Sequence, residues 1–284
     1  MRIEDVLHEL QLHQRIISYD RILDGLDSFV WKVKTVDNGT YALRVLPVDK
    51  HHQFVVERQT MDILKKHHIP VPDIHFLEKT QSFSIMLMDW VKGRTVIDEL
   101  KQCPENAEQI GFQFGKVQAK IHRIRGNIDG NWLLPKTKDE ENIQQHIASL
   151  HDKTPPSLLH LDYHPLNVLT DGENISGVID WVNASIGDYR YDVARTLSLL
   201  RLEHDHLVHS ASISTLETFE KGWSNGYGIS DVEDLSLFCL WAGFRLKWYY
   251  ENKNSPEKIK IIESWIKDWR KKAGGGNETI DRMY

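Results

Sequence analysis

The sequence predicts an α+β fold, in which a β-rich N-terminal part is followed by a mainly helical C-terminal part. Apolar and polar side chains alternate over 30–36, an apolar-rich run follows over 41–46, and the dipeptide Asn38-Gly39 lies between them. This pattern is typical of a β-hairpin, because Asn and Gly tolerate the positive φ that the centre of a tight turn requires. The same part contains one helical and two more strand-like segments: 50–67, 74–77 and 83–90.

From about residue 106 onward, nearly every long segment has helical periodicity. The exception is a run of short strands and turns over 158–181. The predicted helices are 106–124, 188–204, 212–225, 231–251 and 256–271. The change in character near 90–93 predicts a boundary between two lobes, so we expect an N-terminal lobe at 1–90, a C-terminal lobe at 91–273 and a flexible tail at 274–284.

Composition and charge exclude several classes of protein. With 284 residues and 40% hydrophobic content, the chain can fill the core of a soluble globular protein, and no stretch is long and apolar enough for a membrane span. The N-terminus lacks the features of a signal peptide, and Cys103 and Cys239 suggest no disulfide framework. A formal net charge of -6 argues against a general nucleic-acid-binding protein. We therefore expect a cytoplasmic protein with no membrane or nucleic-acid partner.

Polar side chains are concentrated in the stretch HLDYHPLNVL, residues 160–169, which otherwise has the apolar residues of a buried strand and turn. Asp162 and Asn167 lie in this stretch, and Asp180 follows in GVIDW, at the end of a short strand-like run. These three side chains can converge on one point. Phosphoryl transfer needs such a set, because one carboxylate orients and deprotonates the attacking hydroxyl while a second carboxylate and an amide oxygen hold Mg²⁺.

This stretch and GVIDW together resemble the catalytic loop and metal motif of the aminoglycoside phosphotransferase and choline kinase family, small-molecule relatives of the protein kinases. The pair His164-Pro165 and the motif GDYRYDVA over 187–194 are also similar to that family. The resemblance extends from about residue 20 to about residue 200. It implies a bilobal, protein-kinase-like fold, with a nucleotide-binding N-terminal lobe and a catalytic, substrate-binding C-terminal lobe.

The resemblance also implies an ATP-dependent small-molecule kinase, which moves the γ-phosphate of ATP (or GTP) to a hydroxyl with Mg²⁺ bound. Asp162 corresponds to the catalytic carboxylate, and Asn167 and Asp180 correspond to the metal ligands. Asp192, within the second motif, is expected to brace the catalytic loop. His160 is expected to support the loop backbone rather than to act in catalysis.

Four residues of the N-terminal part are expected to lie at the nucleotide. Gly25 and Ser28 occupy the segment where related proteins fold a loop over the phosphates, although a single glycine also fits an ordinary hairpin turn. Arg44 stands where many kinases have the lysine that contacts the α- and β-phosphates, and Glu57 matches its acidic partner. Arginine keeps the charge of lysine but donates in a planar fork, so its contact with phosphate differs in detail.

The segment LMDWVKG, 87–93, resembles the linker between the lobes of such kinases. In that position the backbone of Asp89, Trp90 and Val91 would hydrogen-bond the adenine. The resemblance therefore places the nucleotide between the two predicted lobes.

The acceptor is left open between an antibiotic, such as an aminoglycoside or a macrolide, and a metabolite such as choline, homoserine, a sugar or a fructosamine. Several acids would suit a polycationic acceptor but are equally ordinary on a solvated surface: Glu203, Asp205, Asp231, Glu233 and Asp234. Four aromatic residues at helical spacing could cage a quaternary ammonium, although core packing produces the same spacing: Trp241, Phe244, Trp248 and Tyr249.

Three other interpretations compete with a small-molecule kinase. A zinc site would combine His160 and His164 with His204 or His206, but no His or Cys pair has a recognised zinc spacing. A nucleotide-binding scaffold without turnover is suggested by Arg44 and by the glycine-poor phosphate loop. A protein kinase is disfavoured because the sequence contains no DFG or APE segment.

Overall fold

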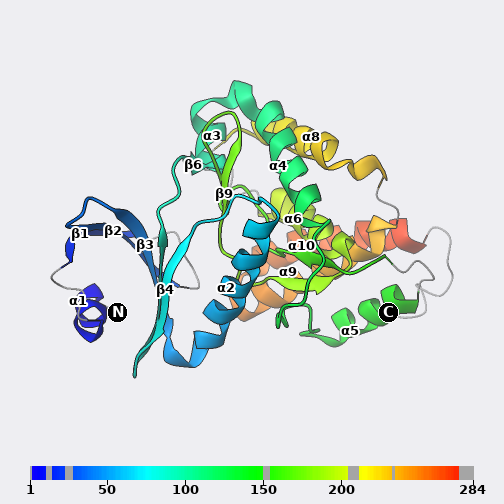
Figure 1. The fold of residues 1–284 in the computed structure, drawn as a ribbon. Coiled ribbons are helices and arrows are strands. Elements are labelled where there is room, and N and C mark those ends of the chain that lie inside the picture. The colour runs from blue at the N-terminus through cyan, green and yellow to red at the C-terminus, as the bar shows by residue number, and fades with distance from the viewer. Residues whose placement is uncertain are drawn as a thin grey trace.

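The computed structural model describes residues 2–10, 15–22, 28–149, 154–203, 211–231 and 234–274. It confirms the predicted α+β fold, because one antiparallel sheet precedes a mainly helical part (Figure 1). The sheet has the strand order β1-β2-β3-β5-β4. Its strands are β1 Ile16–Ile22, β2 Phe29–Thr35, β3 Thr40–Pro47, β4 Ile74–Lys79 and β5 Phe83–Asp89.

The two faces of the sheet pack on different helices. One face packs on α1 (Ile3–Glu9) in a small apolar cluster that includes Leu43 of β3. The other face packs on α2 (His51–Lys66) within the main core, which includes Ala42 of β3. Because side chains of a strand alternate between faces, Arg44 lies on the same face as Ala42 and points toward α2. Figure 1 shows α2 between the sheet and the later helices.

The predicted hairpin is confirmed, but its turn differs from the expected one. The last paired residues of the two strands are Lys34 and Thr40, so the five residues 35–39 lie between them. Among them Asn38 has a positive φ, 62°, and the amide of Thr35 donates to the carbonyl of Gly39 at 3.0 Å. The turn is therefore longer than a two-residue turn with positive φ at both centres.

The C-terminal part contains the long helices that periodicity predicts, with ends shifted by a few residues. The helices after the sheet are α3 Val96–Gln102, α4 Ala107–Ile121, α5 Lys138–Ser149, α6 Tyr189–Leu202, α8 Ile213–Tyr227, α9 Leu235–Asn252 and α10 Pro256–Gly274. Short 3-10 helices occur at Val48–Lys50, Pro104–Asn106 and Ile229–Asp231. No helix of the described ranges is long and apolar enough to cross a membrane.

The exception to the helical pattern is also confirmed. Between α5 and α6 the chain forms β7 Ser157–Leu159, β8 Val168–Thr170, β9 Ile175–Val178 and β10 Ser185–Gly187. Strand β10 pairs with β7, and β8 pairs with both β9 and the short β6 (Arg94–Thr95). The polar stretch at 160–167 is the connection between β7 and β8.

The connection from the sheet to the helical part runs over 90–93 and requires a glycine at its end. Gly93 has a φ of 109°, and a Cβ at this position would lie 2.3 Å from the carbonyl oxygen of Thr170 in β8. A Cβ on Gly177 of β9 would likewise lie 2.7 Å from the side chain of Val91. The connection therefore packs directly on the short strands that follow the polar stretch.

Helix α4 packs closely against α8 and also contacts the polar stretch. A Cβ on Gly222 of α8 would lie 2.2 Å from the carbonyl oxygen of Glu108, so the two helix backbones nearly touch. From the other side, Tyr163 Oη donates to the carbonyl oxygen of Phe114 in α4 at 2.9 Å. The residue next to Asp162 is thus anchored to a tightly packed helix.

Candidate active site

Asp162 and Asn167 are joined within the loop between β7 and β8. Asn167 Nδ2 donates to the carbonyl oxygen and to Oδ2 of Asp162, both at 3.1 Å. His164 of the same loop places its Nε2 3.5 Å from Asp162 Oδ2. The Asp162 side chain remains 26% exposed, so a ligand can reach its carboxylate.

The surroundings of Asp162 keep its carboxylate ionised. Burial opposes ionisation, but the electrostatic interaction and hydrogen bond with His164, together with the charge of Arg195, outweigh it and hold the pKa of Asp162 well below its usual range. At neutral pH this side chain is therefore a hydrogen-bond acceptor. Such a group suits the orientation of a hydroxyl more than the early removal of its proton.

Asp192, at the start of α6, holds the backbone at the beginning of this loop. Its Oδ1 accepts from the amide of Leu161 at 2.6 Å, and its Oδ2 accepts from the amide of His160 at 3.2 Å. Leu161 has a φ of 63°, a conformation that costs free energy for a residue with a side chain. The fully buried carboxylate of Asp192 compensates this cost by accepting hydrogen bonds from the amides of Leu161 and of the preceding residue, His160.

His160 connects the loop to the segment that carries Asp180. Its Nδ1 accepts from the amide of Asp162 at 3.2 Å, and its Nε2 donates to the carbonyl oxygen of Ile179 at 3.0 Å. These two partners define the neutral tautomer with the proton on Nε2. Burial favours the same neutral form by lowering the pKa of His160. Nearby, the amide of Ile179 donates to the carbonyl oxygen of Asn167 at 2.9 Å.

An ion-pair cluster joins the sheet, α2 and the segment after β9; we call Arg44, Glu57 and Asp180 the open cluster. Arg44 Nη1 donates to Glu57 Oε1, and Arg44 Nη2 donates to Asp180 Oδ1 at 3.1 Å. Arg44 Nε lies 3.4 Å from Ser28 Oγ. Arg44 and Glu57 are buried, whereas the Asp180 side chain is 31% exposed.

The open cluster carries one positive and two negative charges. The two carboxylates raise the pKa of Arg44 against the effect of its burial. Burial raises the pKa of Glu57, which Arg44 opposes only in part. Glu57 Oε2 accepts no hydrogen bond from a described residue. The cluster is therefore short of positive charge and would bind a cation favourably.

The residues fit a Mg²⁺ ion of the kind that kinases bind. Among the described residues, Asp180 Oδ2 and Asn167 Oδ1 accept no hydrogen bond, so two hard oxygens are available as ligands. No group of three or more His, Cys, Asp or Glu side chains in the described ranges could hold a metal by itself. Nucleotide phosphates and water molecules usually supply the other ligands of Mg²⁺.

The predicted nucleotide-binding residues are described in part. Gly25 lies outside the described residues. The amide of Asp89 donates to the carbonyl oxygen of Asp73 at 2.9 Å, and the amide of Trp90 donates to the carbonyl oxygen of Thr40 at 3.4 Å. The amide of Val91 donates to no described residue. Of the three predicted linker amides, that of Val91 is thus the one without a hydrogen-bond partner among the described residues.

Sequence analysis did not identify Arg195 or His122 as part of the site. Arg195 Nη2 lies 3.9 Å from Asp162 Oδ1, and its position directly after GDYRYDVA is the signal that could have found it. His122, which follows α4, contacts Asp192 Oδ2 through its Nε2 at 2.8 Å and the hydroxyl of Tyr227 through its Nδ1 at 2.7 Å. No local pattern marks His122, because its partners are distant in sequence.

The competing interpretations receive little support in the described residues. Trp241 and Phe244 are buried in the main core, and the ring of Trp241 packs against Trp132 and Tyr191. Their helical spacing is therefore explained by core packing. Both nitrogens of His160 bond to the backbone, which leaves none for zinc. The remaining candidates for the zinc site and for a polycation site fall largely outside the described residues: His204, His206, Asp205, Glu233 and the side chain of Asp231.

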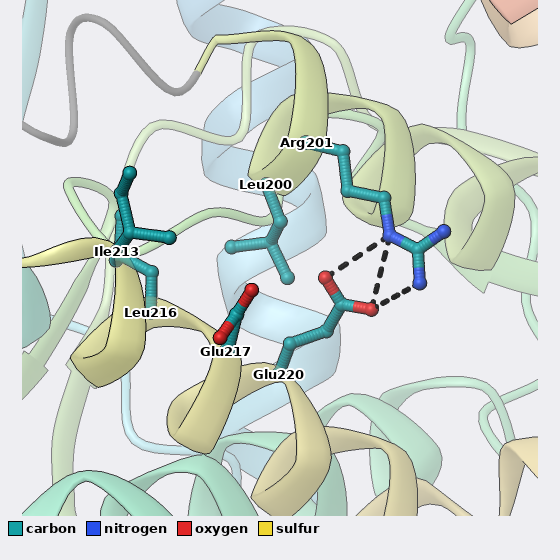
Figure 2. Close-up of a pocket in the computed structure, with 6 residues that line it drawn as sticks. All are labelled: Leu200, Arg201, Ile213, Leu216, Glu217 and Glu220. Carbon is teal, nitrogen blue, oxygen red and sulfur yellow. Dashed lines mark hydrogen bonds and ion pairs between the residues drawn. The ribbon is translucent and has the colours of Figure 1, made fainter.

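A cavity of about 350 Å³ lies between the end of α6 and the start of α8 (Figure 2). Arg201 and Glu220, which form an ion pair at 2.5 Å, line it together with Leu200, Ile213 and Leu216. None of the predicted site residues lines this cavity. It is therefore distinct from the site around Asp162.

The five-stranded sheet packed on α2 and followed by a mainly helical part has the architecture of a kinase-like phosphotransferase. Residues 18–232 match the model of the family named APH, the phosphotransferase enzyme family. Because this match covers most of the chain, the protein belongs to the phosphotransferase enzyme family. The prediction of an ATP-dependent kinase that acts on a small molecule is thereby confirmed.

The proteins to which this chain is similar include a metabolite kinase and antibiotic phosphotransferases. A homoserine kinase of Zymomonas mobilis is 21% identical over 292 residues, which cover 91% of this chain and 88% of the relative. The aminoglycoside phosphotransferase APH(4)-Ia, in a ternary complex with AMP-PNP and hygromycin B, superposes with a TM-score of 0.70 and 15% identity, over 97% of this chain and 99% of that chain. The macrolide 2'-phosphotransferase MphH of Brachybacterium faecium has a TM-score of 0.57 and 15% identity, over 93% and 98% of the two chains. At such identities the structural likeness shows the fold alone.

Proposed function

We propose that this protein transfers the γ-phosphate of ATP to a hydroxyl of a small-molecule acceptor, with Asp162 as the catalytic residue. Asp162 accepts a hydrogen bond from the hydroxyl, orients it, and takes its proton as the new P–O bond forms and the bond between the γ-phosphate and the departing ADP breaks. The observation that carries the proposal is the pair of backbone links at 160–180. His160 hydrogen-bonds to the backbone of both Asp162 and Ile179, and the amide of Ile179 hydrogen-bonds to the carbonyl oxygen of Asn167. Because Asp180 directly follows Ile179, these bonds hold the backbone at Asp162, Asn167 and Asp180 together.

Asn167 and Asp180 would hold Mg²⁺ through their uncommitted oxygens. When bound, the ion neutralises charge on the phosphates. Arg44 would contact the α- and β-phosphates from the other side, and Glu57 holds the guanidinium in place. The excess negative charge of the open cluster supports this assignment.

The nucleotide would lie between an N-terminal lobe at 1–90 and a C-terminal lobe at 91–273. Gly25 and Ser28 would lie near the phosphates, and the backbone of 89–91 would meet the adenine, with Val91 as its donor. Asp192 would brace the catalytic loop, and His160 would support it. Both cysteines are free, which supports a reducing compartment such as the cytoplasm.

The acceptor is either an antibiotic such as an aminoglycoside or a metabolite. The structural similarity to APH(4)-Ia supports the first class, and the homoserine kinase of Zymomonas mobilis supports the second. Fold similarity does not decide between them, because one fold serves many acceptors.

The test is release of ADP from Mg-ATP in the presence of kanamycin, hygromycin B, erythromycin, choline, fructosamine and L-homoserine. We expect turnover with at least one of them, and Asp162→Asn should lower kcat by about 10²- to 10⁴-fold. The Kd of Mg-ATP should remain within about threefold, because Asp162 contacts the acceptor.

Two results would contradict the proposal. One is an Asp162→Asn protein that turns over as fast as the parent protein. The other is tight binding of Mg-ATP with no ADP release for any acceptor, which would support the scaffold without turnover.

A further inference from the structure

Arg195 is a buried arginine beside the catalytic carboxylate with too few partners. Its Nε lies 3.4 Å from the carbonyl oxygen of Leu161, and its Nη2 lies 3.9 Å from Asp162 Oδ1, which is beyond hydrogen-bond distance. Its Nη1 is buried and donates to no described residue. A guanidinium has five N–H donors, so most of the donors of Arg195 have no partner among the described residues.

A second arginine in the same neighbourhood, Arg245, has a hydrogen-bond partner for each guanidinium nitrogen. The guanidinium of Arg245 lies 4.3 Å from the ring centre of Trp132, and that of Arg195 lies 5.5 Å from the same ring. Arg245 donates to both carboxylate oxygens of Glu140 and to the carbonyl oxygens of Trp132 and Leu134. Arg195 has no such set. The lack of hydrogen-bond partners is therefore specific to Arg195 and is not a general property of this part of the fold.

An unused buried donor is costly unless a ligand occupies it. Leaving a buried polar group without a partner costs free energy, and the cost is larger when the group is charged. The effect of burial on Arg195 exceeds that of its neighbours, since its pKa is lowered in spite of Asp162 and Glu203. A group with this deficit beside the reacting position is suited to bind the substrate.

We propose that Arg195 binds a carboxylate of the acceptor through its unpartnered guanidinium edge, so that the acceptor is a hydroxy acid or hydroxy amino acid. This inference rests on the proposed function, because Asp162 must bind the hydroxyl of the same molecule. Arg195 Nη2 lies 3.9 Å from Asp162 Oδ1, and Nη1 is held in the same plane as Nη2 on the same carbon. One small acceptor can then span both groups.

Charge and shape favour a carboxylate over other groups. A carboxylate matches the planar fork of arginine with two parallel hydrogen bonds. A phosphate would bring a second negative charge close to Asp162 and to the incoming nucleotide. An ammonium group would face the guanidinium of Arg195 with like charge, which disfavours a polycationic acceptor at this position.

The first experiment compares matched acceptors with the unaltered protein. ADP release from Mg-ATP is measured with L-homoserine and 4-hydroxybutanoate, and with their analogues that lack the carboxylate, homoserinol and 1,4-butanediol. Kanamycin and hygromycin B represent polycationic acceptors. We expect kcat/KM to be at least about tenfold higher for a carboxylate acceptor than for its matched alcohol, because the alcohol leaves Arg195 unpaired.

The second experiment assigns this preference to Arg195. In Arg195→Gln the ratio of kcat/KM between carboxylate acceptor and matched alcohol should fall to about one, and Arg195→Lys should retain part of it. A purely structural role would lower both rates and leave the ratio unchanged. Arg201→Gln is the matched control, since Arg201 lies on the same helix and pairs with Glu220 at the surface. This control should retain the full ratio.

The outcomes separate this inference from the proposed function. Preference for the matched alcohols or for the polycations would overturn the inference while the proposed function stands. An unchanged ratio in folded Arg195→Gln would also overturn it. If Arg195→Gln does not fold, the comparison of acceptors with the unaltered protein still decides. Absence of ADP release with every acceptor of both panels would reject both proposals.

Discussion

Two buried arginine–glutamate pairs in this protein differ in how completely they are satisfied. In the helical part, Arg245 and Glu140 form what we call the closed cluster, with one positive and one negative charge. Every terminal nitrogen of this arginine has an oxygen partner, and the amide of Lys136 also donates to Glu140 Oε2 at 3.0 Å. The open cluster at the sheet has an additional carboxylate, Asp180, which is partly exposed.

The difference separates a structural role from a functional one. A closed, neutral pair ties elements together and has no remaining affinity for a ligand. An open cluster with spare carboxylate oxygens keeps such affinity at some cost in stability. Loss of a carboxylate should therefore lower mainly the stability at the closed cluster and mainly the activity at the open cluster.

Glu140→Ala should have the largest effect on stability. The substitution leaves Arg245 buried without its charged partner, so we expect the free energy of unfolding to fall by about 3–5 kcal/mol. Chemical denaturation measures this change. Glu141→Ala is the control, because the neighbouring Glu141 lies at the surface in a pair with Lys138 and should cost less than about 1 kcal/mol. A loss of similar size in both variants would show that the closed cluster has no special structural role.

Asp180→Asn should have a large effect on activity and a small one on stability. Arg44 keeps Glu57, so the open cluster becomes neutral and the free energy of unfolding should change by less than about 1 kcal/mol. We expect kcat to fall by about 100-fold, because a ligand for Mg²⁺ is lost. Raising the Mg²⁺ concentration should recover part of the rate. A loss of stability as large as that of Glu140→Ala would remove the distinction between the clusters.

Arg44→Lys should have an intermediate effect on activity. Lysine keeps the positive charge but cannot reach Glu57, Asp180 and Ser28 with separate fork nitrogens, as Arg44 does. We expect kcat/KM for Mg-ATP to fall by about tenfold, which corresponds to about 1.4 kcal/mol. In Arg44→Gln, which also removes the charge, kcat/KM for Mg-ATP should fall further. Equal activity of Arg44→Lys and the parent would show that the fork geometry is dispensable.

Most of the fold could be predicted from the sequence where the pattern is local. The alternation over 30–36 and the helical spacing of apolar residues in the long helices reflect burial of one face. This pattern is visible within each segment by itself. Helix α5 was missed because its sequence, KDEENIQQHIAS, is polar and buries few apolar side chains. One of its buried residues is Glu140, whose partner Arg245 lies far along the chain.

The site could be predicted in part, because some of its residues lie in local sequence motifs. Asp162, Asn167 and Asp180 belong to two short motifs, and the structure brings their segments together through His160. Arg195 directly follows the motif GDYRYDVA, but the number of its partners depends on distant elements, which the motif does not report. A missing partner leaves no trace in a sequence.

His160 gives the smallest predicted effect and tests the link between the loop and the open cluster. Its pKa is lowered in the folded protein, so the folded state favours the neutral ring and the unfolded state binds a proton more readily. The stability that this provides is fully present above the unfolded pKa of about 6.5 and is lost as the pH falls toward the lower folded pKa. Thermal unfolding at pH 7.5 and 5.5 should show a loss on acidification, and His160→Gln should reduce that loss by on the order of 1 kcal/mol. His67→Gln, at an exposed position, should leave the loss unchanged. If His160→Gln lost as much stability on acidification as the parent, neutral His160 would not be what holds Asp162 and the segment of Asp180 together.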